Sequence, residues 1–405
     1  MKESELLHRA EKTLTSYPLC DSCLGRVFRL SNNHVSNAQR GKHIREQLDI
    51  KKKTKTKQCW LCKGLLDEIT HFTRLISDDL KEYEFTTFLI GSRIDDEILN
   101  HEQELLRLTH SESTDTVKME INREIGKILE KKLNKTVDFT HPDITAVIDT
   151  AYDVVHLQIK SLYIYGRYKK FERGIPQTKW PCRVCRGKGC RACEYTGKLY
   201  ETSVEELIAS KILTLTRGDD EAFHGCGRED IDARMLGTGR PFILEIKNPK
   251  KRIIDLNQGK REVNKFGKQR IEVSDLRFSD AEEVVRLKAA EFRKIYSVII
   301  EGASPFTKEK LKKVAQVLHG ATIQQFTPTR VAHRRAHTVR ERKIYNCIVE
   351  SVEGTIARLR METASGTYVK ELISGDEGKT TPNISNLIGF PCTVKELDVL
   401  EIKGE

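Results

Sequence analysis

The sequence predicts an α+β protein in which a zinc-containing N-terminal domain precedes a larger domain with a mixed, largely antiparallel sheet. Segments rich in β-branched and aromatic residues alternate with segments of helical periodicity. Eight of the eleven cysteines fall into four C-x-x-C pairs. The 405 residues suffice for two or three domains, at about 100–200 residues for each domain.

The charge balance favours a polyanionic partner. Lysine and arginine total 70 against 59 aspartate and glutamate residues, so the formal charge is +11. Nucleic acid is the commonest partner of so basic a chain. The sequence lacks an apolar run long enough to span a membrane, and its charged N-terminus lacks the apolar core of a signal peptide. We therefore expect a cytoplasmic protein without a membrane segment, and no obligate protein partner is evident.

The four C-x-x-C pairs indicate two structural zinc sites. Each C-x-x-C turn can offer two thiolates to one ion, and two turns complete a tetrahedral Zn²⁺ site. A redox C-x-x-C or unrelated buried thiols are the alternatives, but a reducing compartment disfavours disulfides. The unpaired Cys226, Cys347 and Cys392 are expected to be core thiols. The expected ligands are Cys20, Cys23, Cys59 and Cys62 for the first site, and Cys182, Cys185, Cys190 and Cys193 for the second.

The N-terminal half is expected to be a small α+β domain behind the first zinc module. A lysine-rich stretch over 51–57 is either a solvated face or a surface that follows phosphates. Residues 83–90 are aromatic and β-branched, which predicts a strand. Isoleucine and leucine recur at helical spacing over 117–133, which predicts an amphipathic helix. Two further strands are expected over 144–149 and 154–164.

The second cysteine quartet predicts a compact zinc knuckle. Only four residues separate its two pairs, and glycines allow the tight turns that bring both pairs to one ion. The preceding residues 166–180 mix basic and aromatic side chains, a composition that contacts RNA. After the knuckle, Ser203 and Glu206 form a capping-box pattern that opens a helix. A domain boundary is expected at about 165–175. Cations stud the knuckle at Arg183, Arg186, Lys188 and Arg191.

A glycine-rich loop carries the candidate nucleophile. The sequence GREDIDARMLGTGRPF begins at Gly227, and residues 242–246 then read as a strand. A carboxylate beside an arginine stays ionised, because the cation lowers its pKa. That suits a nucleophile, although an aspartate beside an arginine in such a loop is more often structural.

Three segments, in order along the chain, resemble the motifs of the pseudouridine synthases. GREDIDARMLGTGRPF resembles the family's catalytic loop, which implies that Asp230 is the nucleophile. QQFTPTRVAHRRAHTVRERKIYN resembles the tyrosine segment, which places Tyr345 where a ring stacks on the uracil. ASGTYVKELISGDEGKTTPNIS resembles the segment with a basic residue, which places Lys370 where it pairs with the aspartate. Asp232 is a second loop carboxylate, expected to bond to loop amides or to Arg234.

With its cysteine-rich N-terminal half, the chain resembles the THUMP-containing archaeal and eukaryotic tRNA pseudouridine synthases. The resemblance implies an N-terminal zinc module over 1–70, a THUMP-type tRNA-binding domain over 71–168, and a pseudouridine synthase catalytic domain over 169–405 with the four-cysteine knuckle at 182–193. It implies isomerisation of uridines 54 and 55 in the tRNA T-loop, with the target base flipped out of its stack. No organic cofactor is implied.

Two other functions compete with this interpretation. A zinc-dependent tRNA-binding protein or RNA chaperone with little catalysis would share the zinc and charge patterns. A methyltransferase or thiolase with a THUMP domain would need a cofactor motif or phosphate loop, and the sequence has neither.

Basic segments suggest how RNA is held. Residues 247–270 hold nine basic and two acidic residues. This composition is typical of a mobile basic loop that clamps RNA, and a merely solvated loop is the alternative. Residues 330–343 form a second basic run, although some of its arginines could pair with acids in the fold. The expected substrate-binding side chains are Arg228, Arg240, Arg330, Arg334 and Arg335.

Overall fold

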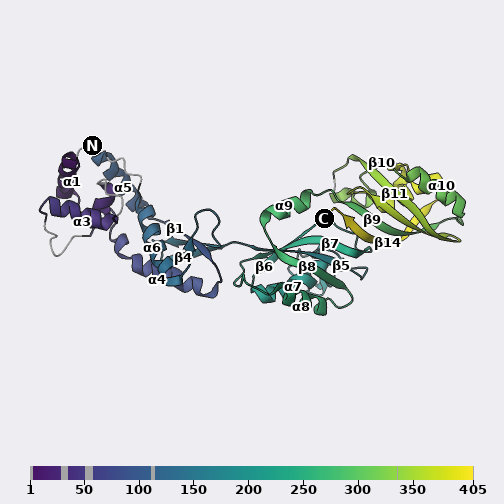
Figure 1. The fold of residues 1–405 in the computed structure, drawn as a ribbon, viewed down its shortest axis with the longest axis horizontal. Helices are drawn as coiled ribbons and strands as arrows, with labels where there is room; N and C mark the ends of the chain where they lie inside the picture. Colours follow the sequence, from purple (N-terminus) through teal and green to yellow (C-terminus); the bar gives the residue numbers. More distant parts are fainter. Residues whose placement is uncertain (1–2, 29–34, 51–57, 111–114, 335, 405) are drawn as a thin grey trace. The chain divides into compact units, whose positions relative to one another are not determined.

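The computed structural model describes residues 3–28, 35–50, 58–110, 115–334 and 336–404. The lysine-rich stretch over 51–57 lies outside the described residues. The chain divides into two units, Met1–Lys160 and Ser161–Glu405, each with its own hydrophobic core (Figure 1).

The first unit consists of helices followed by a sheet. Its α-helices are α1 (Glu3–Ser16), α2 (Asp21–Val27), α3 (Asn37–Gln47), α4 (Ile69–Asp79), α5 (Asp96–Thr109) and α6 (Val117–Leu133), with short 3₁₀ helices η1 (Leu65–Asp67) and η2 (Leu80–Glu82). Its strands are β1 (Thr87–Arg93), β2 (Thr136–Val137), β3 (Ile144–Asp149) and β4 (Val154–Ile159).

Helices α2 and α3 pack closely because each carries a glycine at the contact. A Cβ on Gly25 would lie 1.9 Å from the carbonyl oxygen of Asn37, and a Cβ on Gly41 would lie 1.9 Å from that of Asp21. No side chain larger than hydrogen fits at either position. This contact fixes α2, whose N-cap is Cys20.

The first unit's sheet has the order β2-β1-β3-β4, with β1 parallel to both neighbours and β4 antiparallel to β3. The helix expected over 117–133 is confirmed as α6, which buries Ile121, Ile125 and Leu129. Strand β1 begins at Thr87, later than the expected 83.

The strand expected over 154–164 was wrong, since it forms two strands in different sheets. Strand β4 ends at Ile159 in the first unit, and β5 begins at Leu162 in the second. The chain passes from one unit to the other at Lys160 and Ser161. The domain boundary expected after 168 falls inside β5 (Leu162–Lys170).

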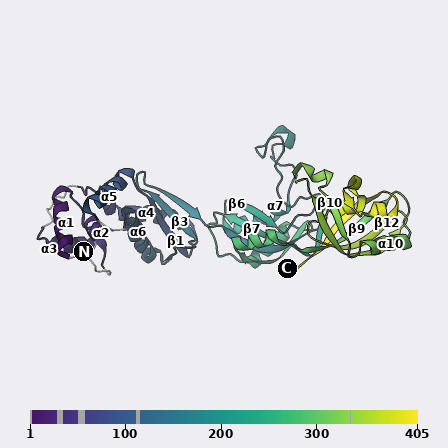
Figure 2. The same ribbon diagram turned by 90° about the horizontal axis from the view of Figure 1, so that it is seen from above.

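The second unit is built on one large sheet (Figures 1 and 2). Its helices are α7 (Val204–Thr216), α8 (Leu256–Phe266), α9 (Ala281–Ala289), α10 (Lys308–Leu318), α11 (Val369–Ser374) and α12 (Ile384–Ile388), with 3₁₀ helices η3 (Arg191–Cys193), η4 (Thr329–Arg334) and η5 (Asp376–Gly378). Its strands are β5, β6 (Asp220–Gly225), β7 (Arg234–Lys247), β8 (Ile271–Ser279), β9 (Arg293–Gly302), β10 (Thr322–Phe326), β11 (Val339–Glu353), β12 (Ile356–Thr363), β13 (Thr380–Thr381) and β14 (Cys392–Lys403).

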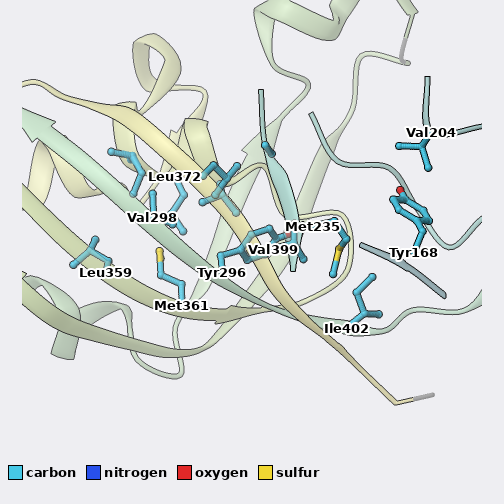
Figure 3. Packing of buried hydrophobic residues seen from close by; sticks show 14 of the residues in the cluster. Tyr168, Val204, Met235, Tyr296, Val298, Leu359, Met361, Leu372, Val399 and Ile402 are labelled. Carbon is cyan, nitrogen blue, oxygen red and sulfur yellow. The ribbon is translucent and has the colours of Figure 1, made fainter. Parts of the chain in front are cut away.

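The strand order is β13-β10-β11-β12-β9-β14-β7-β5-β8, with β6 paired to β7. Only β14 and β7 run parallel among the described pairs of this sheet. The predicted mixed, largely antiparallel sheet is therefore confirmed. Apolar side chains from β7, β9, β12 and β14 interdigitate in its core, as Met235, Val298, Leu359 and Val399 illustrate (Figure 3).

The basic segment 247–270 was expected to be a mobile loop, and this was wrong. Its second half contains α8, which Asp255 caps through a hydrogen bond from the Asn257 amide. Val263 is fully buried, and Gly259 lets α8 approach Ile212 of α7. The apolar positions within this basic run therefore fix it as a helix, and its cations cover the outer face.

None of the helices in the described part of the chain has the length and hydropathy that crossing a bilayer requires.

The α2–α3 contact predicts that replacing a glycine by alanine destabilises the first unit at this contact but not elsewhere. Gly41→Ala forces a Cβ against the Asp21 backbone, so we expect it to lower the unfolding free energy of the first unit by about 1–3 kcal/mol. Gly126→Ala in α6 meets only the Val137 side chain at 3.7 Å, and we expect it to be neutral or to stabilise by up to about 1 kcal/mol. Thermal unfolding followed by Trp60 fluorescence in a Trp180→Phe background measures both. Equal effects would contradict the close approach.

Candidate active site and metal centres

The loop between β6 and β7 directs two adjacent carboxylates to opposite sides. Glu229 points inward, where its fully buried carboxylate lies 2.8 Å from Arg240 Nε and accepts the Tyr168 hydroxyl at 2.8 Å. Arg240 is equally buried and donates to the Cys226 carbonyl at 2.7 Å. Burial and the charge of Glu229 raise the pKa of Tyr168, so its hydroxyl remains a donor. With Glu229 held inside, the next side chain, Asp230, faces solvent.

A buried lysine and a buried glutamine fix the loop's backbone. Lys170 Nζ donates to the carbonyl oxygens of Ile175, Asp230 and Ile231, at 2.8, 3.3 and 3.1 Å. Burial lowers the pKa of Lys170, while the Glu229 charge 3.9 Å away acts in the opposite direction. Gln177 donates to the Gly227 carbonyl at 2.9 Å. The position of Asp230 is thus set by groups beneath the loop.

Two cations from the C-terminal part of the chain meet Asp230. Arg330 donates to one of its carboxylate oxygens at 3.0 Å, and Lys370 Nζ lies 3.5 Å from the other. Lys370 lies closer to Asp232, at 2.7 Å. Burial opposes ionisation of Asp232, but the hydrogen bonds from Lys370 hold the pKa of Asp232 below its ordinary value. The structure therefore brings together three side chains that the sequence placed near the reaction, Asp230, Arg330 and Lys370.

Arg330 is itself held in place from below. Its guanidinium contacts Glu371 at 2.6 Å, and the side chain of Glu371 is buried. Burial opposes the charge of Arg330, but the hydrogen bond to Glu371 and the charge of Asp230 raise the pKa of Arg330 above its ordinary value. Asp230 is therefore paired with a permanent cation.

Lys370 was expected on a strand and lies in the first turn of helix α11. Strand β12 ends at Thr363, and Gly366 adopts a positive φ of 74°, which turns the chain into the helix. The fully buried Gln325 clamps the helix start, because it accepts from the Tyr368 amide at 2.9 Å and donates to the Tyr368 carbonyl at 3.0 Å. The ammonium of Lys370 thus projects from a fixed point.

Asp230 lies on the wall of a cavity of about 750 Å³. This volume is within the usual range for a small-molecule or nucleotide-sized site. Two tyrosines, Tyr296 of β9 and Tyr368, also line the cavity. Most of its charged lining is basic: Arg228, Arg240, Lys288, Lys294, Arg330, Arg340, Arg342 and Lys370. A flat, neutral group attached to a polyanion suits such a cavity.

Tyr345 does not line this cavity, which corrects the expected placement of the stacking ring. It lies in a neighbouring hollow of about 500 Å³, with the Arg293 guanidinium 3.8 Å from its ring centre. The expectation assumed regular alternation along β11, but the register shifts between Ile344 and Asn346. Such a bulge redirects the side chain at that point.

Tyr296 was missed by the sequence reasoning. Its segment, KIYSVII, reads as a buried strand, and only the side-chain alternation of Lys294 and Tyr296 could have indicated a shared polar face. Burial raises the pKa of Tyr296 to about 12. The ring therefore stays neutral, as stacking on a base requires.

The five expected substrate-binding arginines have different surroundings. Arg228 lines the cavity, with its guanidinium 5.5 Å from the Trp180 ring centre. Arg330 meets Asp230. Arg240 also lines the cavity, but it is 1% exposed and bound to Glu229, so its contact with substrate stays a prediction. The Arg334 side chain and the whole of Arg335 lie outside the described residues.

The first cysteine quartet forms a group that could hold a metal ion. The four sulfur atoms lie within 4.8 Å of one another, and the Sγ atoms of Cys20 and Cys62 are 3.9 Å apart. A tetrahedron with bonds of about 2.3 Å has edges of about 3.8 Å, whereas a disulfide needs about 2.05 Å. The Cys20 amide donates to Cys59 Sγ at 3.2 Å, as an amide does to a thiolate. The donor set fits a metal ion.

The second quartet has the same geometry on a separate loop. Its sulfur atoms include pairs separated by 3.7, 3.8 and 4.0 Å, and all four lie within 4.8 Å of one another. Amides of Gly189, Cys190 and Gly197 donate to its sulfurs at 3.2–3.3 Å. Gly197 has a positive φ of 72°, and a Cβ there would lie 2.4 Å from the Gly187 carbonyl oxygen. This set also fits a metal ion.

Comparisons with known proteins agree along the whole chain. Residues 163–403 match the family model "Pus10, C-terminal", and residues 72–149 match "Pus10 THUMP domain, archaeal". The chain is 38% identical to the tRNA pseudouridine synthase Pus10 of Methanothrix thermoacetophila, over 99% of this chain and 95% of that protein. It is 41% identical to the enzyme of the same name from Methanocaldococcus jannaschii, over 96% and 93% respectively.

Among solved structures, a chain of a Cbf5–Nop10–Gar1 complex aligns with a TM-score of 0.33 and 15% identity, over 58% of this chain and 47% of that chain. This similarity is too low to inform about function.

The Glu229–Arg240 pair predicts that removing Glu229 lowers the unfolding free energy far more than removing the loop carboxylate of Asp232. Glu229→Ala leaves a buried guanidinium without its carboxylate, so we expect the second unit to lose about 3–5 kcal/mol of unfolding free energy. Asp232→Ala removes a partner whose side chain is 67% exposed, and should cost at most about 1 kcal/mol. Urea unfolding followed by Trp180 fluorescence in a Trp60→Phe background reports on this unit. Similar losses in both variants would argue against the buried pair as the anchor.

Proposed function

This chain belongs to the Pus10 family of tRNA pseudouridine synthases, and we propose that it isomerises uridines 54 and 55 in the T-loop of tRNA. The observation that carries this proposal is Asp230, held outward beside two cations at the edge of a basic, nucleotide-sized cavity. A uridine inside a folded tRNA must leave its stack to enter such a cavity.

The reaction is an isomerisation, so nothing is gained or lost overall. The bond between N1 and C1′ breaks, a bond between C5 and C1′ forms, the C5 proton leaves, and N1 gains a proton. We propose that Asp230 is the nucleophile, attacking either C1′ or the uracil ring and leaving again before product release. Arg330 donates a hydrogen bond to its carboxylate at 3.0 Å and so orients it. Lys370 supports it while also binding Asp232.

Tyr296 is proposed to stack on the flipped uracil. It lines the same cavity as Asp230 and Lys370, whereas the ring of Tyr345 is covered by Arg293 in a separate hollow. Stacking on one base contributes roughly 1–3 kcal/mol. The two strand tyrosines therefore have different proposed roles, with only Tyr296 in contact with the target base.

The cavity's cations are proposed to bind phosphates on either side of the target nucleotide. Arg228, Arg340 and Arg342 line the cavity, and Arg334 and Arg335 follow in the same basic run as Arg330. In the N-terminal half, we propose a zinc module over 1–70, followed by a THUMP-type domain that holds the tRNA and ends with the first unit at Lys160. The catalytic domain is proposed to follow over 161–405.

We propose that both four-cysteine groups hold Zn²⁺ in a structural role. Four cysteine ligands leave no open position for catalysis, and the thiolates stay reduced in the cytoplasm, where we place the enzyme. The expected content is two zinc ions per chain by elemental analysis. Cys62→Ser and Cys190→Ser should each lower it to one ion, and a wild-type value near zero would remove this part of the proposal.

Pseudouridine mapping on unmodified tRNA transcripts tests the proposed function. The wild-type protein should convert positions 54 and 55, and transcripts with cytidine at either position should lose only that signal. Product confined to another position would show that a different uridine is the target. Tight binding without product would favour the tRNA-binding protein with little catalysis.

The tyrosine assignment predicts unequal effects of one substitution at two positions. Tyr296→Ala removes the ring from the wall of the cavity, and we expect the single-turnover rate to fall at least tenfold. Tyr345→Ala leaves that wall intact and should change the rate less than threefold. A large loss with Tyr345→Ala and none with Tyr296→Ala would restore the assignment expected from the sequence.

A further inference from the structure

The second four-cysteine group lies on a knuckle, residues 181–198, that projects from the second unit. A short antiparallel stem joins it to the body, in which the Cys182 amide donates to the Gly197 carbonyl at 2.7 Å and the Leu199 amide to the Trp180 carbonyl at 2.9 Å. In Figure 2 this teal segment, which precedes α7 in the chain, stands out from the body of the second unit. Only Cys182 and Gly197 of the knuckle are buried. The sulfur cluster is therefore its core.

The cations of the knuckle divide into paired and unpaired sets. Two lysines at the stem are neutralised by the body, Lys179 by Glu221 and Lys198 by Glu206. Four cations farther out are exposed, and within the described residues none of them forms an ion pair: Arg183, Arg186, Lys188 and Arg191. The single acid among them is Glu194. Four thiolates on one divalent ion would add two negative charges at the centre, which these cations surround.

Large apolar side chains are exposed between these cations. Tyr195 is 75% exposed and Val184 is 73% exposed. Because neither is buried against the body, both are available on a frame that the sulfur cluster keeps rigid. Cations beside an exposed aromatic ring form the surface that binds phosphates and stacks on unpaired bases.

The root of the knuckle contacts the loop that carries Asp230. Trp180, the first residue of the stem, packs against Arg228 at 5.5 Å and edge-on against Tyr200 at 5.7 Å. Arg228 lines the cavity of Asp230. A nucleic acid seated at this cavity therefore lies at the root of the knuckle.

We propose that the knuckle is an RNA-contacting finger, in which Arg183, Arg186, Lys188 and Arg191 bind backbone phosphates of the tRNA and Tyr195 stacks on an unpaired base. This inference rests on the proposed tRNA substrate. It assigns the second metal site a task beyond bracing the fold, because the ion would hold the finger in its binding shape.

Two full-chain variants test the finger, against a matched control. One is Tyr195→Ala, and the other replaces Arg183, Lys188 and Arg191 together by glutamine. The control replaces the exposed Lys308, Lys312 and Lys313 of α10 by glutamine, which removes the same charge from the same unit. Each is measured for its Kd to an unmodified tRNA transcript over a range of salt, for KM and kcat, and for metal content.

Tyr195→Ala is expected to weaken binding about tenfold. The triple variant should lower the slope of log Kd against log salt by about two to three, and the control should leave it unchanged. In both knuckle variants KM should rise while kcat stays near the wild-type value. If the triple variant loses metal, its cations stabilise the thiolate centre, and its Kd no longer tests contact with RNA. Tyr195→Ala, whose metal content should stay unchanged, then decides whether the knuckle contacts RNA.

If both knuckle variants have the Kd and the salt slope of the wild-type protein, the inference is overturned. The knuckle would then serve to bind a protein partner or only to support folding. The proposed function fails separately, if wild-type protein binds the transcript but forms no pseudouridine. In that case the comparison of Kd values still decides whether the knuckle contacts RNA.

Discussion

The ion pair between Glu229 and Arg240 is the constraint on which the rest of the site depends. Both groups are out of water, so each must keep its partner. Arg240 is fixed by β7, and Tyr168 on β5 donates to the same carboxylate, so the pair ties the loop to two central strands. One side chain later, Asp230 has to emerge from the protein. Removing one partner of this pair would cost about 3–5 kcal/mol, a large part of the stability of an ordinary domain.

Around this anchor the site is assembled from distant parts of the chain. Arg330 comes from η4, Lys370 from α11 and Tyr296 from β9, and each is held by a buried neighbour or by its strand. Glu371 fixes the guanidinium beside Asp230, the proposed nucleophile, and Gln325 fixes the start of the helix that carries the Lys370 ammonium. The sheet supplies the positions and the basic rim supplies attraction for a polyanion. The two four-cysteine groups have different surroundings. Cys23, Cys59 and Cys62 of the first lie within the apolar core of the first unit, whereas the second group is itself the core of its knuckle.

Sequence patterns predicted features that depend on local spacing. The helix over 117–133 followed from its apolar periodicity, and both four-cysteine groups followed from the C-x-x-C pairs. Features set by long-range packing were not readable. A bulge in β11 turned Tyr345 away from the cavity, and Tyr296 was hidden in an ordinary apolar strand. Nothing local distinguishes Arg240, which is buried against Glu229, from Arg330, which meets Asp230. The helix α8 within a basic run depended on contact with α7, which the sequence does not display.

Asp230, and not the neighbouring Asp232, is the carboxylate to which we assign the reaction. Single-turnover pseudouridine formation with excess enzyme, measured for Asp230→Asn and Asp232→Asn together with the Kd of each variant for tRNA, tests this directly. We predict no detectable product from Asp230→Asn with binding retained, and product from Asp232→Asn at a reduced or normal rate. Product from Asp230→Asn and none from Asp232→Asn would contradict the assignment.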